Sequence, residues 1–122
     1  MLVLFNKPYG VLSQFTSDGG KWRTLAEFVA TPNIYAAGRL DADSEGLLLL
    51  TDNGALQAAI AGDRSTVTKT YWAQVEGVAT REHTDKLTRG VTLNDGPAQA
   101  IHARVLESRS EPWPRNPPIR VR

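Results

Sequence analysis

The chain has 122 residues, of which 41% are apolar and 22% are charged, and it contains no cysteine. Such a chain is long enough for one small domain and too apolar to be intrinsically disordered, and it can form neither disulfides nor thiolate metal sites. Its formal net charge of +1 excludes no class of partner by itself.

The apolar runs in the sequence are short. The opening MLVLFNKPYG has four apolar residues after Met1, and the leucine run at residues 47–50 also has four. A signal peptide needs a longer apolar core, and a membrane-spanning helix needs about 20 predominantly apolar residues. We therefore expect a cytoplasmic protein without a membrane partner.

The first elements predicted along the chain are two strands and a helix. LVLF at 2–5 and VLSQF at 11–15 are typical of short strands, and the loop NKPYG joins them. TLAEFV at 24–29 predicts a short helix, because Thr24 and Glu27 have the spacing of a capping box.

The middle of the chain predicts two more strands and a second helix. IYAAG at 34–38 indicates a strand, and the continuous apolar run GLLLLT at 46–51 indicates a buried one. A helix is expected over residues 53–61, with Thr51 or Asp52 as its N-cap.

The last third alternates in the same irregular way. VTKTYWAQVE at 67–76 is rich in β-forming residues, Thr80 can cap a helix over 81–89, and AIHARVLE at 100–107 indicates a further strand after an Asn-Asp-Gly turn. Strands and helices mixed without a repeating order predict an α+β domain that occupies residues 1–122.

The end of the chain is basic and rich in proline. Residues 104–122 carry five arginines against two glutamates, and residues 110–122 contain four prolines. Proline excludes a helix or a central strand here, so an extended connection is expected over 108–122. Arginine stacks on bases and grips phosphates, which suits RNA, although a solubilising tail has the same composition.

The stretch GRLDADSEGLLLLTDNG at 38–54 concentrates acidic side chains beside a leucine strand. It approaches the EF-hand pattern, but that motif needs flanking helices and an oxygen ligand where the sequence has leucine. The carboxylates of Asp41, Asp43 and Glu45 could instead form a catalytic site at a cleft, or they could be solvated loop charges. Physical reasoning alone does not single out Asp41 among them.

The stretch KTYW at 69–72 places Lys69 and Tyr71 on one face of the predicted strand. A basic residue beside an aromatic ring suits a stacked base and its phosphate, and cross-strand packing explains the same pattern. The two histidines, His83 and His102, have no partner at metal-ligand spacing, so we expect no metal site.

Three motifs occur in a characteristic order, NKPYG at 6–10, GRLDADSEGLLLLTDNG at 38–54 and KTYWAQVEG at 69–77. With WPRNPPIR at 113–120, they resemble the bacterial pseudouridine synthases that modify ribosomal RNA. The resemblance is to the group of small-subunit synthase A and large-subunit synthases B, E and F, with the E type most similar, and it covers almost the whole chain.

The resemblance implies a role for individual residues. Asp41 matches the catalytic aspartate of the family, Arg39 would pair with it and hold the extruded nucleotide, and Tyr71 would stack on the uracil. Six further residues would support the site or bind RNA: Lys7, Pro8, Gly38, Leu40, Gly46 and Lys69.

The resemblance also implies the reaction and the fold. A uridine of large-subunit rRNA would be flipped out of its helix and isomerised to pseudouridine during ribosome biogenesis, with Asp41 as nucleophile or base. This reaction requires neither a cofactor nor a metal. The implied fold is the N-terminal portion of the synthase catalytic domain, a mixed, mainly antiparallel sheet with short flanking helices.

Two departures from the family pattern shape the expectations. No S4 RNA-binding domain precedes the first motif, and the arginine-rich motif that completes the uracil pocket of the family is absent before Arg122. We therefore expect a C-terminally truncated catalytic domain, with an exposed sheet edge that can cause self-association.

Three functions remain open on this basis. The chain is an rRNA-modifying isomerase, or a catalytically incomplete RNA-binding fragment of the same fold, or a carboxylate-dependent nucleoside hydrolase. Free uracil as a product would identify the hydrolase, and loss of activity on exchange of Asp41 for asparagine would distinguish the isomerase from the fragment.

Overall fold

The computed structural model describes residues 1–106. The chain divides into two compact units, Met1–Thr70 and Tyr71–Arg122, and each unit is described by itself. The described residues form short helices and antiparallel strands, which confirms the predicted α+β class. The expected extended connection at 108–122 lies outside the described residues.

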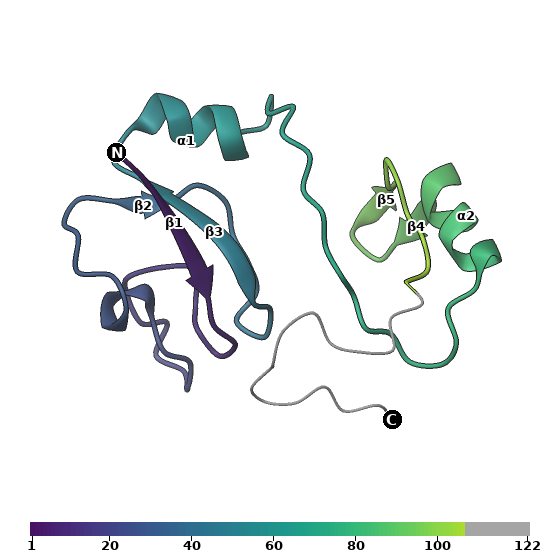
Figure 1. Ribbon diagram of the computed structural model, residues 1–122, viewed down its shortest axis with the longest axis horizontal. Helices are drawn as coiled ribbons and strands as arrows, with labels where there is room; N and C mark the ends of the chain where they lie inside the picture. Colours follow the sequence, from purple (N-terminus) through teal and green to yellow (C-terminus); the bar gives the residue numbers. More distant parts are fainter. Residues whose placement is uncertain (107–122) are drawn as a thin grey trace. The chain divides into compact units, whose positions relative to one another are not determined.

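The first unit is built on a three-stranded antiparallel sheet (Figure 1). Its strands are β1 (Leu2–Lys7), β2 (Tyr35–Ala36) and β3 (Gly46–Thr51), in the order β1-β3-β2. β1 pairs along the whole of β3, from Leu2 opposite Thr51 to Lys7 opposite Gly46. This register places Lys7 where the acidic loop enters β3.

One face of this sheet carries the hydrophobic core. The fully buried members of the core are Val11, Leu25, Ile34, Leu48 and Leu50. β3 is the central strand of this sheet, and the burial that its apolar run predicts is one-sided. Leu48 and Leu50 are 3% and 0% exposed, whereas Leu47 is 64% exposed because successive side chains point to opposite faces of a sheet.

The predicted helix at 24–29 is a single 3-10 turn, η1 (Leu25–Glu27). Thr24 is its N-cap residue but makes no side-chain capping bond, so the predicted capping box is wrong. The Glu27 carboxylate instead accepts a hydrogen bond from Arg23 Nε, four residues earlier. Its partner is therefore a guanidinium rather than the backbone N–H that a capping box requires.

Helix α1 (Gly54–Ala61) follows β3 directly and ends before Gly62, as expected. Its N-cap is Asn53, whose Oδ1 accepts from the Leu56 N–H at 3.0 Å, and not Thr51 or Asp52. Thr51 is unavailable as a cap because it is still part of β3, where its hydroxyl donates to the Met1 carbonyl at 2.7 Å.

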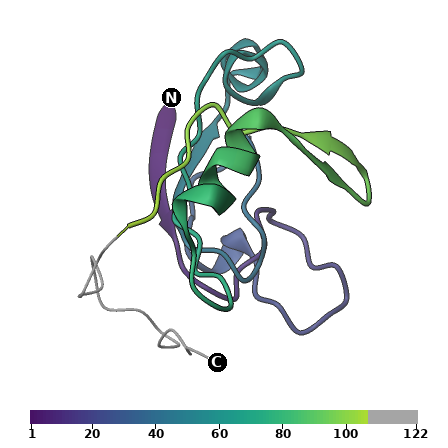
Figure 2. The same cartoon turned by 90° about the vertical axis from the view of Figure 1, so that its right-hand side faces the viewer.

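The second unit contains a helix and a hairpin (Figures 1 and 2). Helix α2 (Arg81–Arg89) has Thr80 as N-cap, as predicted, and β4 (Val91–Leu93) pairs with β5 (Gly96–Ala98) across the predicted Asn-Asp-Gly turn. After the hairpin the chain returns to the helix, where the Ala100 N–H donates to the Leu87 carbonyl at 2.9 Å.

Three predicted strands do not form in the described chain. These are residues 11–15, 67–76 and, as far as residue 106, the segment 100–107. The first makes one isolated parallel bridge, Val11 with Arg23, and the other two have no regular secondary structure. Their side-chain pattern suits a strand, but a strand also needs a neighbour for its backbone hydrogen bonds.

β1 has a partner on one side only among residues 1–106, so it is an edge strand there. Self-association through such an edge stays a prediction. Neither α1 nor α2, the two α-helices of the described chain, has the length and apolar character that crossing a bilayer requires.

Candidate active site

The acidic stretch forms a loop between β2 and β3 of the first unit. Glycines with positive φ bracket it, Gly38 at +114° and Gly46 at +131°, values that other residues adopt only with strain. Within the loop the Ser44 N–H donates to the Asp41 carbonyl at 3.0 Å and closes a turn. The turn leaves the side chain of Asp41 exposed to solvent.

Lys7 lies beneath this loop and is 0% exposed. Its ammonium donates to three backbone carbonyls, Val11 at 2.7 Å, Pro8 at 3.0 Å and Ala42 at 3.5 Å. One side chain thus ties the end of β1 and the NKPYG loop to the residue after Asp41.

The charge of Lys7 has opposing influences. Burial lowers the pKa of Lys7 below its ordinary value of 10.5, and the carboxylates of Asp43, Asp41 and Glu45 act in the opposite direction. The acidic loop therefore supplies negative charge near a buried ammonium, which reduces the cost of keeping that ammonium inside the protein.

The backbone on both sides of Asp41 is held by the segment that follows β1. The Ser13 hydroxyl donates to the Leu40 carbonyl at 2.7 Å and accepts from the Leu40 N–H at 2.9 Å. The Gly10 N–H donates to the Ala42 carbonyl at 2.6 Å. Asp41 therefore has a fixed backbone and an accessible carboxylate, the combination that a catalytic acid group requires.

Sequence reasoning missed Ser13 and Gly10 as supports of the site. Residues 11–15 looked like a strand, and a serine in a strand gives no signal of a contact 27 positions away, the separation of Ser13 and Leu40. Only the loop geometry brings the two residues together.

Arg39 is exposed, and its guanidinium Nη2 donates to Gln14 Oε1 at 3.4 Å. Among the ion pairs of residues 1–106 none joins Arg39 to Asp41. Ser13 and Gln14 are adjacent in the chain, and so are their partners Leu40 and Arg39. One short segment thus contacts two consecutive residues of the loop.

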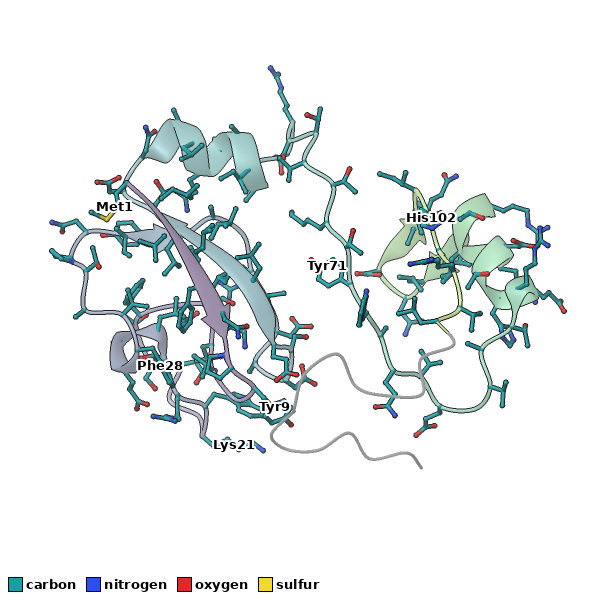
Figure 3. The ribbon with its side chains drawn as sticks, viewed as in Figure 1. Met1, Tyr9, Lys21, Phe28, Tyr71 and His102 are labelled. Carbon is teal, nitrogen blue, oxygen red and sulfur yellow. The ribbon has the colours of Figure 1, made fainter. Side chains whose placement is uncertain are left out.

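The remaining expected site residues fall into two groups. Pro8, Gly38, Leu40 and Gly46 lie in the first unit, where the Pro8 carbonyl accepts from Lys7, Gly46 pairs with Lys7, and Gly38 and Leu40 precede Asp41 in the loop. Lys69 is exposed near the end of that unit, and Tyr71, 63% exposed and labelled in Figure 3, begins the second unit.

No group of three or more histidine, cysteine, aspartate or glutamate side chains in residues 1–106 is arranged to hold a metal ion. The elements beside the acidic loop are β2 and β3, whereas an EF-hand calcium loop has a helix on each side.

Comparison with protein families gives a match over residues 1–115 to RNA pseudouridylate synthase. The chain belongs to the RNA pseudouridylate synthase family. This finding confirms the resemblance drawn from the three motifs, and the matched range includes Lys7, Ser13, the acidic loop and Tyr71.

Two curated relatives of the chain share one name within this family. The chain is 57% identical over 124 residues to "Ribosomal large subunit pseudouridine synthase E" of Xanthomonas axonopodis pv. citri, covering 100% of the chain and 65% of the relative. It is 47% identical to the protein of the same name from Vibrio vulnificus, covering 99% of the chain and 51% of the relative.

A large-subunit synthase of type B is also similar to this chain. "Ribosomal large subunit pseudouridine synthase B" of Bacillus subtilis is 38% identical over 104 residues, which cover 84% of the chain and 43% of the relative. The chain thus spans less than two thirds of the length of these curated synthases.

Proposed function

We propose that this chain supplies the catalytic aspartate of an RNA pseudouridine synthase that isomerises a uridine of large-subunit rRNA. The observation that carries the proposal is Asp41, an exposed carboxylate whose neighbours Leu40 and Ala42 are both held by backbone hydrogen bonds. Membership of the synthase family and the names of its relatives support the choice of reaction and substrate.

The reaction needs a carboxylate that reaches the sugar or base of a single nucleotide. The C1′–N1 bond of the uridine breaks, the uracil turns, and a C1′–C5 bond forms. The hydrogen on C5 leaves as a proton, and N1 gains one, so the uridine and its product have the same atoms. Asp41 acts as nucleophile or as base on a uridine that has been flipped out of its helix.

Arg39 and Tyr71 have binding roles in this proposal. The exposed guanidinium of Arg39, held lightly by Gln14, is free to meet a phosphate of the flipped nucleotide. The exposed ring of Tyr71 stacks on the uracil and keeps the detached base near the sugar. An rRNA substrate in bacteria also agrees with the expected cytoplasmic location.

A second candidate is an RNA-binding piece without turnover. It is favoured by one observation, that the chain spans 65% and 51% of two of its curated relatives. A piece of this kind would bind rRNA through the same residues and leave the uridine unchanged.

The test is tritium release from large-subunit rRNA transcribed with C5-tritiated uridine, since isomerisation frees the C5 hydrogen. We expect release by the 122-residue chain and none by Asp41→Asn. Asp43→Asn is the matched control, because Asp43 is exposed on the same turn and should keep most of the activity.

The other outcomes decide between the candidates. Binding of the rRNA without tritium release would favour the RNA-binding piece, and release that persists in Asp41→Asn would refute the role of Asp41. Free uracil in the products would identify the hydrolase instead.

A further inference from the structure

A second group of aromatic and basic side chains lies in the first unit, outside the residues assigned above. Tyr9 and Trp22 meet edge to face, with ring centroids 6.2 Å apart and an interplanar angle of 80°. The Lys21 ammonium lies 4.7 Å from the centroid of the Trp22 ring. We call Tyr9, Lys21 and Trp22 the aromatic cluster; Figure 3 labels its first two members.

The aromatic cluster is joined to the Asp41 loop through one residue. Gly10 packs against the Trp22 ring, since a side-chain carbon added to it would lie 3.7 Å from that ring. The N–H of the same glycine donates to the Ala42 carbonyl at 2.6 Å. Tyr9 therefore precedes Gly10 in the chain, and Gly10 contacts Ala42, the residue after Asp41.

The three side chains of the aromatic cluster differ in their exposure to solvent and in their contacts. Tyr9 is 37% exposed, so part of its ring meets solvent. Trp22 is half-buried and meets the tyrosine ring edge to face. Among the ion pairs of residues 1–106 none includes Lys21, whereas the nearby Arg23 pairs with Glu27 and covers Phe28.

We propose that the aromatic cluster binds an unpaired nucleotide of the RNA next to the target uridine. Its base stacks on Tyr9, Trp22 holds the tyrosine ring in place, and Lys21 meets the adjoining phosphate. This inference rests on the proposed function, because it takes the RNA that reaches Asp41 as the ligand.

The chemistry favours single-stranded RNA over a duplex. An aromatic ring can stack only on a base whose face has been exposed, as in loops, bulges and flipped-out sites. Extruding a uridine from its helix also unstacks its neighbours, so a stacking surface beside Asp41 would compensate for part of that cost.

The first experiment measures binding of a fluorescein-labelled single-stranded RNA decamer of uridines to the 122-residue chain by fluorescence anisotropy. We expect Tyr9→Ala to weaken binding by about 5- to 150-fold, the usual effect of losing one stacking ring. Tyr9→Phe keeps the ring and should bind within about twofold of the unchanged chain. A labelled duplex of the same length should bind equally to all three proteins.

Tyr35→Ala is the matched control. Tyr35 is 62% exposed in the same unit, and it pairs with Thr51, whereas Lys7 of the NKPYG loop pairs with Gly46. Tyr35 thus lies at the opposite end of β3 from Lys7. Loss of the Tyr35 ring should leave binding of the decamer unchanged.

Lys21→Gln gives an independent measurement that does not depend on the aromatic rings. Loss of one phosphate contact on a single strand lowers the slope of log affinity against log salt concentration by about 0.7. An unchanged slope would overturn the phosphate contact of Lys21.

The outcomes also separate this inference from the proposed function. If Asp41→Asn loses tritium release while Tyr9→Ala binds the decamer normally, the aromatic cluster is refuted and the proposed function stands. If no protein releases tritium but Tyr9→Ala and Lys21→Gln both weaken binding, the aromatic cluster stands as an RNA-binding site and the proposed function fails for this chain. Equal losses in Tyr9→Ala and Tyr35→Ala would refute a specific site.

Discussion

At the scale of single residues, Lys7 is the side chain that most affects the electrostatics of the site. It is 0% exposed, and moving a lysine charge out of water costs several kcal/mol unless hydrogen bonds and opposite charges compensate. Three carbonyl acceptors and the nearby carboxylates supply that compensation, while the pKa of Lys7 stays below its ordinary value.

The lowered pKa of Lys7 makes stability depend on pH in a defined direction. Between the folded-state pKa and 10.5 the unfolded chain binds more protons than the folded chain, so stability rises with pH. The slope inside this window is at most about 1.4 kcal/mol per pH unit, and it falls to zero outside the window. Urea unfolding from pH 7 upward measures the free energy of unfolding of the unchanged chain and of Lys7→Met. The difference between the two proteins should change with pH inside the window, and a constant difference would contradict the prediction.

Ser13 is expected to position Asp41 and not to contact RNA. Ser13→Ala removes both hydrogen bonds to Leu40, so we expect a loss of about 1–2 kcal/mol in stability. A loosened Asp41 should also lower kcat by about 10- to 100-fold with little change in KM. Tritium-release kinetics and amide exchange at Leu40 measure these effects.

Ser65→Ala is the control for Ser13. The Ser65 hydroxyl also makes two backbone bonds, donating to the Ile60 carbonyl at 2.7 Å and accepting from the Val67 N–H at 3.2 Å. Its loss should reduce stability by a similar amount and leave kcat unchanged. A fall in kcat of equal size in both variants would mean that Ser13 has only a general structural role.

At the scale of elements, α1 depends on its first residues and its contact with the sheet. Asn53 caps the helix, and Gln57 Nε2 donates to the Ala36 carbonyl of β2 at 2.9 Å. A helix of eight residues is too short to persist alone in water. The cap and the tertiary contacts therefore decide whether it forms.

Asn53→Ala should lower the free energy of unfolding by about 1 kcal/mol, because the Leu56 N–H loses its acceptor. Asn53→Asp keeps an oxygen at that position and should retain most of the stability. Urea midpoints followed by circular dichroism compare the two variants, and equal midpoints would show that the cap contributes nothing.

At the scale of the whole molecule, the chain is organised as two compact units that meet in sequence between Thr70 and Tyr71. The segment 66–75 across this boundary is exposed at every position and has no regular secondary structure. It also carries Lys69 and Tyr71, the residues expected to meet RNA. An exposed segment without regular secondary structure is therefore proposed to bind substrate.

Brief trypsin treatment tests this organisation. We expect the first cuts after Arg64 or Lys69, because an exposed segment without regular structure is cut before a helix. Lys86, inside α2, is the internal comparison and should be cut later. Mass spectrometry of the first fragments identifies the cleavage sites. An initial cut within α2 would contradict the division into these units.

The elements that the sequence predicted correctly are those with local signals. The leucine run predicted the strand β3, and Thr80 predicted the start of α2. The segments at 11–15 and 67–76 have equally good β-forming patterns, but a strand requires a partner that no local pattern specifies. The N-cap of α1 was displaced to Asn53 because β3 extends through Thr51.

The sequence by itself determined the family, because three motifs in a fixed order identify it without knowledge of their geometry. The motif around Asp41 also led to the prediction that this residue is the catalytic aspartate. The tertiary structure decided how the backbone beside Asp41 is held, since Ser13 bonds to Leu40, and Gly10 and Lys7 bond to Ala42, through contacts that no local pattern encodes. It likewise brought Tyr9 and Trp22 together beside the loop, because contacts between distant segments arise only when the chain folds.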